Sequence, residues 1–332
     1  MSQPVENFSD YNLNDDDAER IDIVIPDSCA GFRLDQALQS LLPDYSRSRL
    51  QTWIKEEKVM VDDKPAIAKQ KVWGGENISV IPEVHPSEMP YLAEEIALNV
   101  VYEDDTILIV NKPAGLVVHP GSGNWQGTLL NALLHHAPQV SQVPRAGIVH
   151  RLDKDTSGLL VVAKTLTAQT DLVRQLQART VKREYLAIAR GQITQDGKVV
   201  TPIGRHPKSR TKMAVVRNGK PAITYYHVLE NFSGHTLVQC RLETGRTHQI
   251  RVHMQSIGHP LAGDQVYIGQ TAHVNPELRE PIRLFGRQAL HATRLGLIHP
   301  VTHEPMEWEA EMPQDMVDLL EVLRKTDEQS KQ

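Results

Sequence analysis

A dense cluster of charged residues stands directly before an apolar run in the middle of the chain. Residues 150–155 hold five ionisable side chains, among them Asp153, and Gly158 then opens a run of leucine and valine that is typical of a buried strand. Charges carried to the edge of a core cost free energy unless they are paired, so such a cluster usually serves chemistry or a ligand. A carboxylate there could act as a nucleophile or as a base. The alternative is a salt-bridged loop that merely precedes a strand.

The same stretch resembles the signature of a known enzyme family. Residues 150–159 read H-R-L-D-x-x-T-S-G-L, a pattern that resembles the RNA pseudouridine synthases of the large-subunit ribosomal type. The resemblance covers residues 20–325 and implies that Asp153 is the catalytic nucleophile. It also implies that Tyr185, in Arg-Glu-Tyr, is the active-site tyrosine. Arg251, in G-R-T-H-Q-I-R-V-H, is then the basic residue that pairs with the aspartate.

The reaction that this resemblance implies needs only side chains. Turning uridine into pseudouridine breaks a glycosidic bond and rejoins the same base through carbon, so we expect neither a cofactor nor a metal. A guanidinium favours the ionised form of a neighbouring carboxylate, and a tyrosine offers a flat face to the uracil. The target base must leave its stack to be reached, and the resemblance implies that Arg151 fills the vacated space. We expect His150 and Arg246 to contact the substrate as well.

Other classes of function agree less well with the sequence. His248 and His253 are five residues apart, whereas a helical pair of zinc ligands needs a spacing of four, and no glutamate lies between them. The G-x-S-x-G pattern of serine hydrolases is absent. Two alternatives stay open: a non-catalytic RNA-binding protein, for which Asp153 would be dispensable, and a synthase that modifies uridines in other ribosomal or transfer RNAs.

The composition of the 332 residues is that of an ordinary globular protein, with 40% hydrophobic and 23% charged residues. Cys29 and Cys240 lie far apart, which favours reduced thiols and a cytoplasmic location. No apolar run reaches the roughly 18 residues that a membrane helix needs, and the polar N-terminus does not fit a secretory signal. Without a repeat or a coiled-coil seam, we expect a monomer.

The net charge of −5 hides a strongly basic segment. Residues 1–20 hold six acids and one arginine, and residues 311–332 hold six acids and three bases. Residues 172–213, in contrast, hold ten lysines and arginines against two acids. A local positive field of this size matters more to a polyanion than the total charge does, so the segment favours an RNA partner. The family resemblance implies that this partner is ribosomal RNA. A merely solvated basic face is the alternative.

The N-terminal region reads as a small module of strands and two helices, of which Ser46 is expected to cap the second. The module resembles the S4 RNA-binding fold. This resemblance rests on Arg33-Leu34-Asp35, on Ser-Arg-Ser-Arg at 46–49, and on Val59–Val61 with the Asp-Asp turn after it. Arg47 and Arg49, near a helix N-terminus, suit phosphate contact. A small helical domain with surface arginines is the alternative.

The second domain mixes strands and helices without a regular alternation, so we expect an α+β fold with a largely antiparallel or mixed sheet. One helix is expected to be capped by Thr167 and to end near Ala178. Residues 203–213 read as a basic loop, and the loop from 268 to 287 departs from the family pattern.

The expected segments of the whole chain are a disordered acidic tail at 1–20, the S4-like domain at 21–82, a proline-rich linker at 83–97, the pseudouridine synthase domain at 98–325 and a polar tail at 326–332.

Overall fold

A computed structural model describes residues 20–82, 91–121, 123–209, 211–268 and 275–330. The chain divides into two compact units between Met89 and Pro90, and each unit has a hydrophobic core of its own. The disordered tail expected at 1–20, except for Arg20, and the linker residues 83–90 lie outside the described residues.

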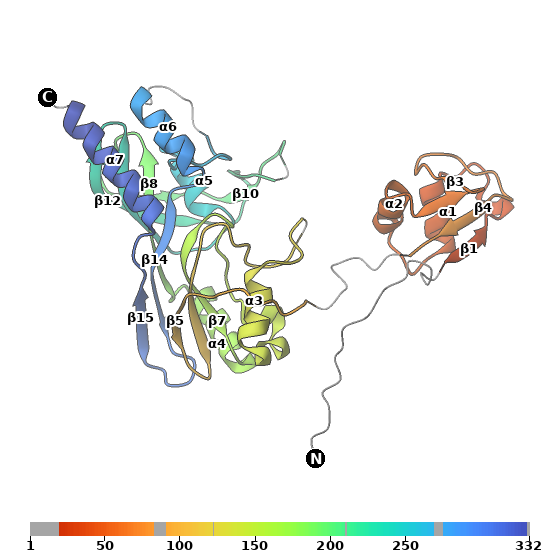
Figure 1. Cartoon of the computed structure of the whole chain (residues 1–332), viewed down its shortest axis with the longest axis horizontal. Coiled ribbons are helices and arrows are strands. Elements are labelled where there is room, and N and C mark those ends of the chain that lie inside the picture. Colours follow the sequence, from red (N-terminus) through yellow and green to blue (C-terminus); the bar gives the residue numbers. More distant parts are fainter. Residues whose placement is uncertain (1–19, 83–90, 122, 210, 269–274, 331–332) are drawn as a thin grey trace, which may run out of the picture. The chain divides into compact units, whose positions relative to one another are not determined.

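The N-terminal unit is a four-stranded antiparallel sheet with two helices (Figure 1). Its strands pair in the order β1 (Ile21–Val24), β4 (Asn77–Val80), β2 (Val59–Val61) and β3 (Lys64–Pro65). Its helices are α1 (Leu34–Leu41) and α2 (Arg47–Lys55). Leu34, Leu38 and Leu50 are fully buried in the core between them.

Local sequence signals explain how this unit is put together. Ser46 caps α2 as expected, because its side chain accepts a hydrogen bond from the backbone N–H of Arg49 at 3.3 Å. Asp62 and Asp63 both have a positive φ, at 47° and 61°, which is the backbone that a two-residue hairpin turn between β2 and β3 requires. Aspartate tolerates this conformation better than most residues do.

The second unit is built on a nine-stranded mixed sheet. Eight strands follow one another in the order β5 (Val100–Glu103), β6 (Ile107–Lys112), β7 (Ser157–Ala163), β14 (Leu290–Ile298), β8 (Lys182–Arg190), β13 (His235–Leu242), β12 (Ile223–Phe232) and β9 (Gly197–Val200). The ninth, β15 (Pro305–Glu309), pairs with β14. Among the described strands of this sheet, only the short pairing of β7 with β14 is parallel. The predicted α+β fold with a mixed, largely antiparallel sheet is therefore confirmed.

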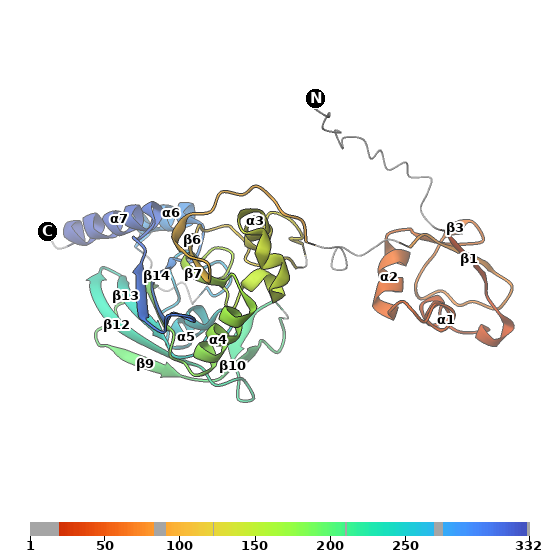
Figure 2. The same cartoon turned by 90° about the horizontal axis from the view of Figure 1, so that it is seen from below.

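Helices cover this sheet in separate groups. They are α3 (Leu129–His136), α4 (Leu166–Gln177), α5 (Gln249–Ser256), α6 (Pro276–Phe285) and α7 (Gln314–Ser330). In Figures 1 and 2, α6 and α7 lie side by side, whereas α3 and α4 lie near one another elsewhere on the unit. None of the helices in the described part of the chain is long and apolar enough to span a membrane.

Strand β7 lies inside the unit and is buried on both faces. Leu160 and Val162 face the core that α3 and α5 share, and Leu159 and Val161 face the core that contains α4. This explains why the strand reads as a continuous apolar run without alternation. The charged loop 150–156 leads directly into β7. Its C-terminal end is therefore held by a strand that is buried on both faces.

Several expected boundaries were wrong. Thr165, not Thr167, caps α4, since its hydroxyl accepts a hydrogen bond from the Ala168 N–H at 3.1 Å. Residues 203–213 are not wholly a loop, because they include β10 (Ile203–Arg205) and reach the antiparallel strand β11 (Met213–Val215). The divergent segment before Arg287 contains helix α6, which carries Pro281 in its interior.

The two ends of the second unit also differ from expectation. Residues 91–97, assigned to the linker, contact α3 and the turn before it. The Glu94 carboxylate accepts hydrogen bonds from the Gly127 N–H at 3.1 Å, and Asn131 on α3 donates to the Leu92 carbonyl at 2.8 Å. At the other end, α7 continues to Ser330, so residues 326–330 are helical and not a tail.

Candidate active site

The backbone of the Asp153 loop is fixed by hydrogen bonds to its carbonyl groups. The Lys112 side chain is 1% exposed, and its ammonium donates to the carbonyls of Pro113, Leu116 and Lys154 at 2.8, 2.9 and 2.9 Å. Burial lowers the pKa of Lys112 to about 8, which leaves it charged at neutral pH. One buried ammonium therefore joins the turn after β6 to the loop that carries Asp153.

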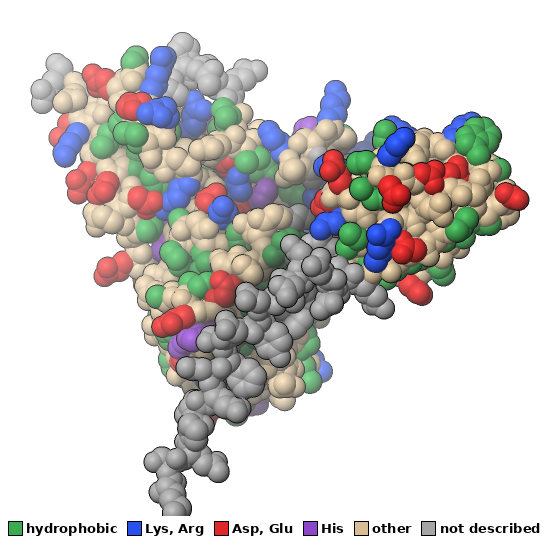
Figure 3. All heavy atoms as spheres, turned by 45° about the vertical axis from the view of Figure 1, so that its right-hand side comes forward, with side chains coloured by type: hydrophobic (Ala, Val, Ile, Leu, Met, Phe, Trp, Pro, Cys, Tyr) green, Lys and Arg blue, Asp and Glu red, His purple; other side chains and the backbone are tan. Residues whose placement is uncertain are grey.

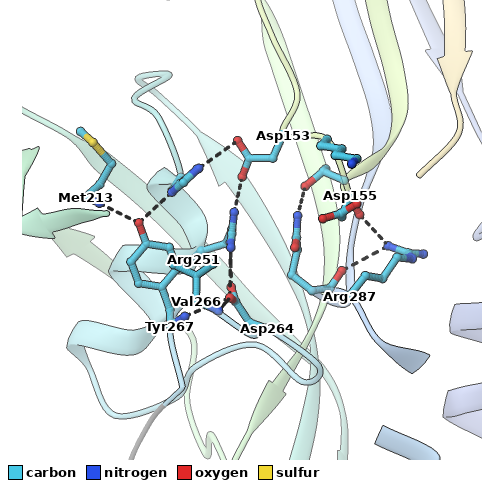
Figure 4. A network of polar contacts seen from close by, with 12 residues as sticks. Asp153, Asp155, Met213, Arg251, Asp264, Val266, Tyr267 and Arg287 are labelled. Atoms are coloured by element: carbon cyan, nitrogen blue, oxygen red, sulfur yellow. Dashed lines mark hydrogen bonds and ion pairs between the residues drawn. The ribbon is translucent and has the colours of Figure 1, made fainter. Parts of the chain in front are cut away.

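The end of the loop and the start of β7 are anchored to β14 and to the residues just before it. Arg287 donates to the carbonyl of Asp155 at 3.1 Å, as Figure 4 shows, and the hydroxyl of Ser157 lies 2.9 Å from Nδ1 of His291. Gly158 has a φ of +114°, and a Cβ added there would lie 2.2 Å from the Ala292 carbonyl oxygen. The T-S-G part of the motif is thus explained by the pairing of β7 with β14. Only glycine at 158 allows the two backbones to approach this closely.

Asp153 is joined to a buried ion pair at the start of α5. Its Oδ2 accepts a hydrogen bond from Nη1 of Arg251 at 2.9 Å. The other donors of the same guanidinium bind Asp264, from Nε to Oδ2 at 2.7 Å and from Nη2 to Oδ1 at 3.0 Å. Figure 4 shows Arg251 lying between the two carboxylates. Such bidentate binding leaves the guanidinium one fixed orientation toward Asp153.

The charges in this network stabilise one another. Burial by itself would lower the pKa of Arg251, but the hydrogen bonds and charge of Asp264, with those of Asp153, outweigh it and raise that pKa above its usual value. Burial would likewise raise the pKa of Asp264, yet Arg251 and the backbone N–H groups of Tyr267 and Val266 hold it below the usual range. Arg251 is therefore a permanent cation and Asp264 a permanent anion at neutral pH.

Three aromatic rings complete the surroundings of Asp153. Tyr185, on β8, is 6% exposed and lines the same cleft, and its burial raises the pKa of its hydroxyl. His248 lies 3.8 Å from Oδ1 of Asp153, and its Nδ1 is 2.7 Å from the Tyr267 hydroxyl. The Tyr267 hydroxyl in turn accepts a hydrogen bond from the Met213 N–H at 2.9 Å. Tyr185 and Asp153 thus face one cleft, and His248 and Tyr267 support its wall.

The cleft is large and strongly basic. It encloses about 1000 Å³ and lies wholly within the second unit. Two carboxylates, those of Asp153 and Glu243, line it among the described residues. Six arginines line it as well: Arg145, Arg151, Arg179, Arg183, Arg246 and Arg251. This excess of guanidinium groups gives the cleft a positive potential that suits a polyanion.

No three His, Cys, Asp or Glu side chains in the described ranges are grouped as a metal ion would require.

The structure places the other predicted residues in different settings. Arg151 is exposed at the rim of the cleft, and Arg246 lines it while donating to the Pro221 carbonyl at 3.1 Å. His150 also lines the cleft, but its Nε2 accepts a hydrogen bond from the Val161 N–H at 3.2 Å. Burial lowers the pKa of His150 to about 3, so it is neutral, and its contact supports the strand. Arg47 and Arg49 belong to the N-terminal unit.

Sequence reasoning did not identify Asp264, His248 or Tyr267 as parts of the site. Asp264 is one of 41 acidic residues in the chain, and nothing in the sequence marks it as the buried partner of Arg251. From the sequence His248 suggests only a possible metal ligand, and Tyr267 directly precedes the divergent segment 268–287. A φ of 56° at His248, which turns its ring toward Asp153, could not be read from the sequence.

Comparison with known proteins assigns this fold and site to a class. The sequence model of the RNA pseudouridylate synthase family matches residues 106–256, which contain Asp153, Tyr185 and Arg251. Among solved structures, human RNA Pseudouridylate Synthase Domain Containing 4 superposes with a TM-score of 0.54 and 26% identity. That match covers 68% of this chain and 93% of the human one. The second unit therefore has the pseudouridylate synthase fold.

Two bacterial relatives are more similar still. Ribosomal large subunit pseudouridine synthase D of Nitrosomonas europaea is 60% identical over 92% of this chain and 88% of its own length. The protein of the same name from Neisseria meningitidis serogroup B is 56% identical over 96% of this chain and 87% of its own. The chain therefore belongs to the RNA pseudouridine synthase family, whose members are isomerases.

Proposed function

We propose that this protein isomerises specific uridines of large-subunit (23S) ribosomal RNA to pseudouridine, with Asp153 as the nucleophile. The observation that carries the proposal is the position of Asp153, whose carboxylate is bound by Arg251 and faces a basic cleft beside Tyr185. The substrate follows from relatives that are named for the large ribosomal subunit. An unmodified large-subunit RNA transcribed in vitro and tritiated at uridine carbon 5 should release tritium when the protein is added.

The reaction is balanced without a cofactor. The bond between the ribose and the ring nitrogen of uracil breaks, the base turns, and ring carbon 5 bonds to the same ribose carbon. Carbon 5 loses its proton to solvent and the ring nitrogen gains one. Asp153 attacks during bond cleavage and is released again when the new bond forms, so the enzyme returns to its starting state.

Each neighbour of Asp153 has a role that its geometry supports. Arg251 holds the carboxylate in one orientation and is itself held by Asp264, so the nucleophile is preorganised. Tyr185 presents its ring to the uracil inside the cleft. The exposed guanidinium of Arg151 can enter the helix stack that the flipped base has left.

The loop anchor Lys112 offers a test of preorganisation. Lys112→Met keeps the volume but leaves the carbonyls of Pro113 and Leu116 without their buried donor. We expect the free energy of unfolding in urea to fall by about 2–4 kcal/mol and turnover to fall by about tenfold to a hundredfold. The control is Lys154→Met, since Lys154 contributes its backbone carbonyl and not its side chain to the contact. Equal effects of the two substitutions would contradict the anchoring role.

The N-terminal unit is proposed to be an S4-like RNA-binding domain. Its most buried charge is Asp35, which accepts hydrogen bonds from Arg33 at 3.1 Å and Arg47 at 2.8 Å. Both arginines stay more than a third exposed, so they can also contact phosphate. Arg49 stacks on Trp53, with its guanidinium carbon 5.0 Å from the ring centroid. On the face in Figure 3, basic side chains of this unit lie among acidic and hydrophobic ones. This distribution suits a few localised contacts with RNA phosphates.

Removal of the N-terminal unit should weaken RNA binding without removing the chemistry. A protein that begins at Pro90 keeps residues 91–97 on α3 and the four hydrophobic clusters described in the second unit. It should fold, bind ribosomal RNA more weakly, and still isomerise uridine at high enzyme concentration. The log–log salt dependence of binding should become shallower by about one unit for each phosphate that the shortened protein no longer binds. Unchanged affinity and salt slope would refute a binding role for the unit.

The cellular setting follows from the same proposal. Cys29 and Cys240 are both buried and free, as thiols are in a reducing cytoplasm, where ribosomal RNA is also found.

The cleft is lined by residues of one chain and needs no residue from a second copy, so we propose that the protein acts as a monomer.

A further inference from the structure

Arg183, on β8, is a buried cation for which the described residues supply no ion-pair partner. The residue is 7% exposed, and its Nε is buried without a hydrogen-bond acceptor. No carboxylate of the described residues forms an ion pair with it, whereas Arg251, Arg179 and Arg287 each have one. Burial lowers the pKa of Arg183 below its usual value, which marks the cost of keeping the charge there.

Arg183 lines the cleft that holds Asp153. Arg183 and Tyr185 alternate with exposed or half-buried neighbours, so both face inward, roughly 7 Å apart along the strand. Gly245 makes room for the group, because a Cβ at that position would lie 2.6 Å from Nη1 of Arg183. Its charge also depresses the pKa of His150, which adds to the effect of burial. The cation is thus built into the wall beside the base-facing tyrosine.

An unpaired buried charge costs free energy that the fold does not recover. Lys112 and Arg251, the other buried cations around Asp153, are satisfied by carbonyls and by carboxylates. Arg183 lacks such a partner, so its compensation must come from a ligand. An anion in the cleft would supply the countercharge that Arg183 lacks and could accept hydrogen bonds from its guanidinium.

We propose that Arg183 binds a phosphodiester group of the RNA next to the target uridine. The inference rests on the proposed function and adds a substrate-binding residue to it. A nucleotide whose base lies on Tyr185 would bring its own backbone within reach of Arg183, two residues away on the same strand face. A phosphodiester fits better than uracil, because it carries a full charge as soon as RNA binds, whereas uracil gains charge only while its glycosidic bond is broken.

The test compares Arg183→Met with Arg183→Lys and with Lys182→Met in the full chain, on unmodified large-subunit RNA transcribed in vitro. Arg183→Met should raise KM by about tenfold to a hundredfold and flatten the salt slope by about one unit, with kcat nearly unchanged. Its thermal stability should stay equal or rise, because a costly buried charge is gone. Arg183→Lys should recover part of the affinity. Lys182→Met, which removes a neighbouring exposed charge, should behave like wild type.

Three results would overturn the proposal. An unchanged KM and salt slope in Arg183→Met, with wild type active, would show that Arg183 does not contact RNA while the proposed function stands. A fall in kcat at unchanged KM would place Arg183 at the reacting base and not at a phosphate. A clear loss of thermal stability together with activity would make it a structural residue. An inactive wild type would instead refute the proposed function.

Discussion

Asp153→Asn should abolish pseudouridine formation while the protein stays folded and keeps its affinity for RNA. The amide has nearly the shape of the carboxylate, and its oxygen can still accept the hydrogen bond from Arg251 that Asp153 accepts at 2.9 Å. The amide cannot act as a nucleophile, so kcat should fall by about a thousandfold or more. Tritium release from uridine carbon 5 measures the turnover, and filter binding measures the affinity.

Asp155→Asn is the matched control for this substitution. It removes a carboxylate from the same loop, but Asp155 is held through its backbone carbonyl, which Arg287 contacts at 3.1 Å. We expect Asp155→Asn to keep most of the activity. Appreciable turnover by Asp153→Asn would contradict the catalytic assignment, and loss of RNA binding by the same variant would indicate a structural role for the carboxylate.

Arg251→Leu should damage both stability and catalysis. The Asp264 side chain is fully buried, and among the described residues Val266 and Tyr267 alone would still donate hydrogen bonds to it without Arg251. A buried charge that loses its partner costs about 3–5 kcal/mol, which urea unfolding would detect. Asp153 also loses the group that orients it, so turnover should fall by at least about a hundredfold.

A double substitution separates these two effects. Arg251→Leu combined with Asp264→Asn no longer strands a buried charge, so it should recover much of the stability and none of the activity. Arg251→Lys should be intermediate, because one ammonium cannot bind two carboxylates in the forked geometry of a guanidinium. A double variant that regains wild-type turnover would remove Arg251 from the catalytic site and leave it a purely structural role.

The sequence predicted those parts of the protein that local patterns determine. The apolar run of β7, the cap at Ser46 and the tight turn at Asp62 follow from residue types over a few positions. The prolines of α6 concealed a helix, because Pro281 within it disfavours that prediction. At α4 the sequence offers threonines at both 165 and 167, and either could cap a helix.

The site was harder to predict because its contacts join distant parts of the chain. Asp153 and Arg251 are 98 residues apart, and only the family resemblance suggested that they pair. Arg183 stands between a lysine and a glutamate, so the sequence suggests a solvated charge, whereas the register of β8 turns it into the cleft. Arg47 resembled a free phosphate contact, but the burial of Asp35 gives it a structural partner as well.

The most direct test of the account maps pseudouridine across ribosomal RNA from cells that lack this protein. Specific large-subunit positions should read as uridine in these cells and as pseudouridine once the wild-type protein is restored. The Asp153→Asn protein, expressed to the same level, should leave the same positions as uridine. Restoration of those pseudouridines by Asp153→Asn, or a large-subunit map that does not change when the protein is absent, would contradict the central claim.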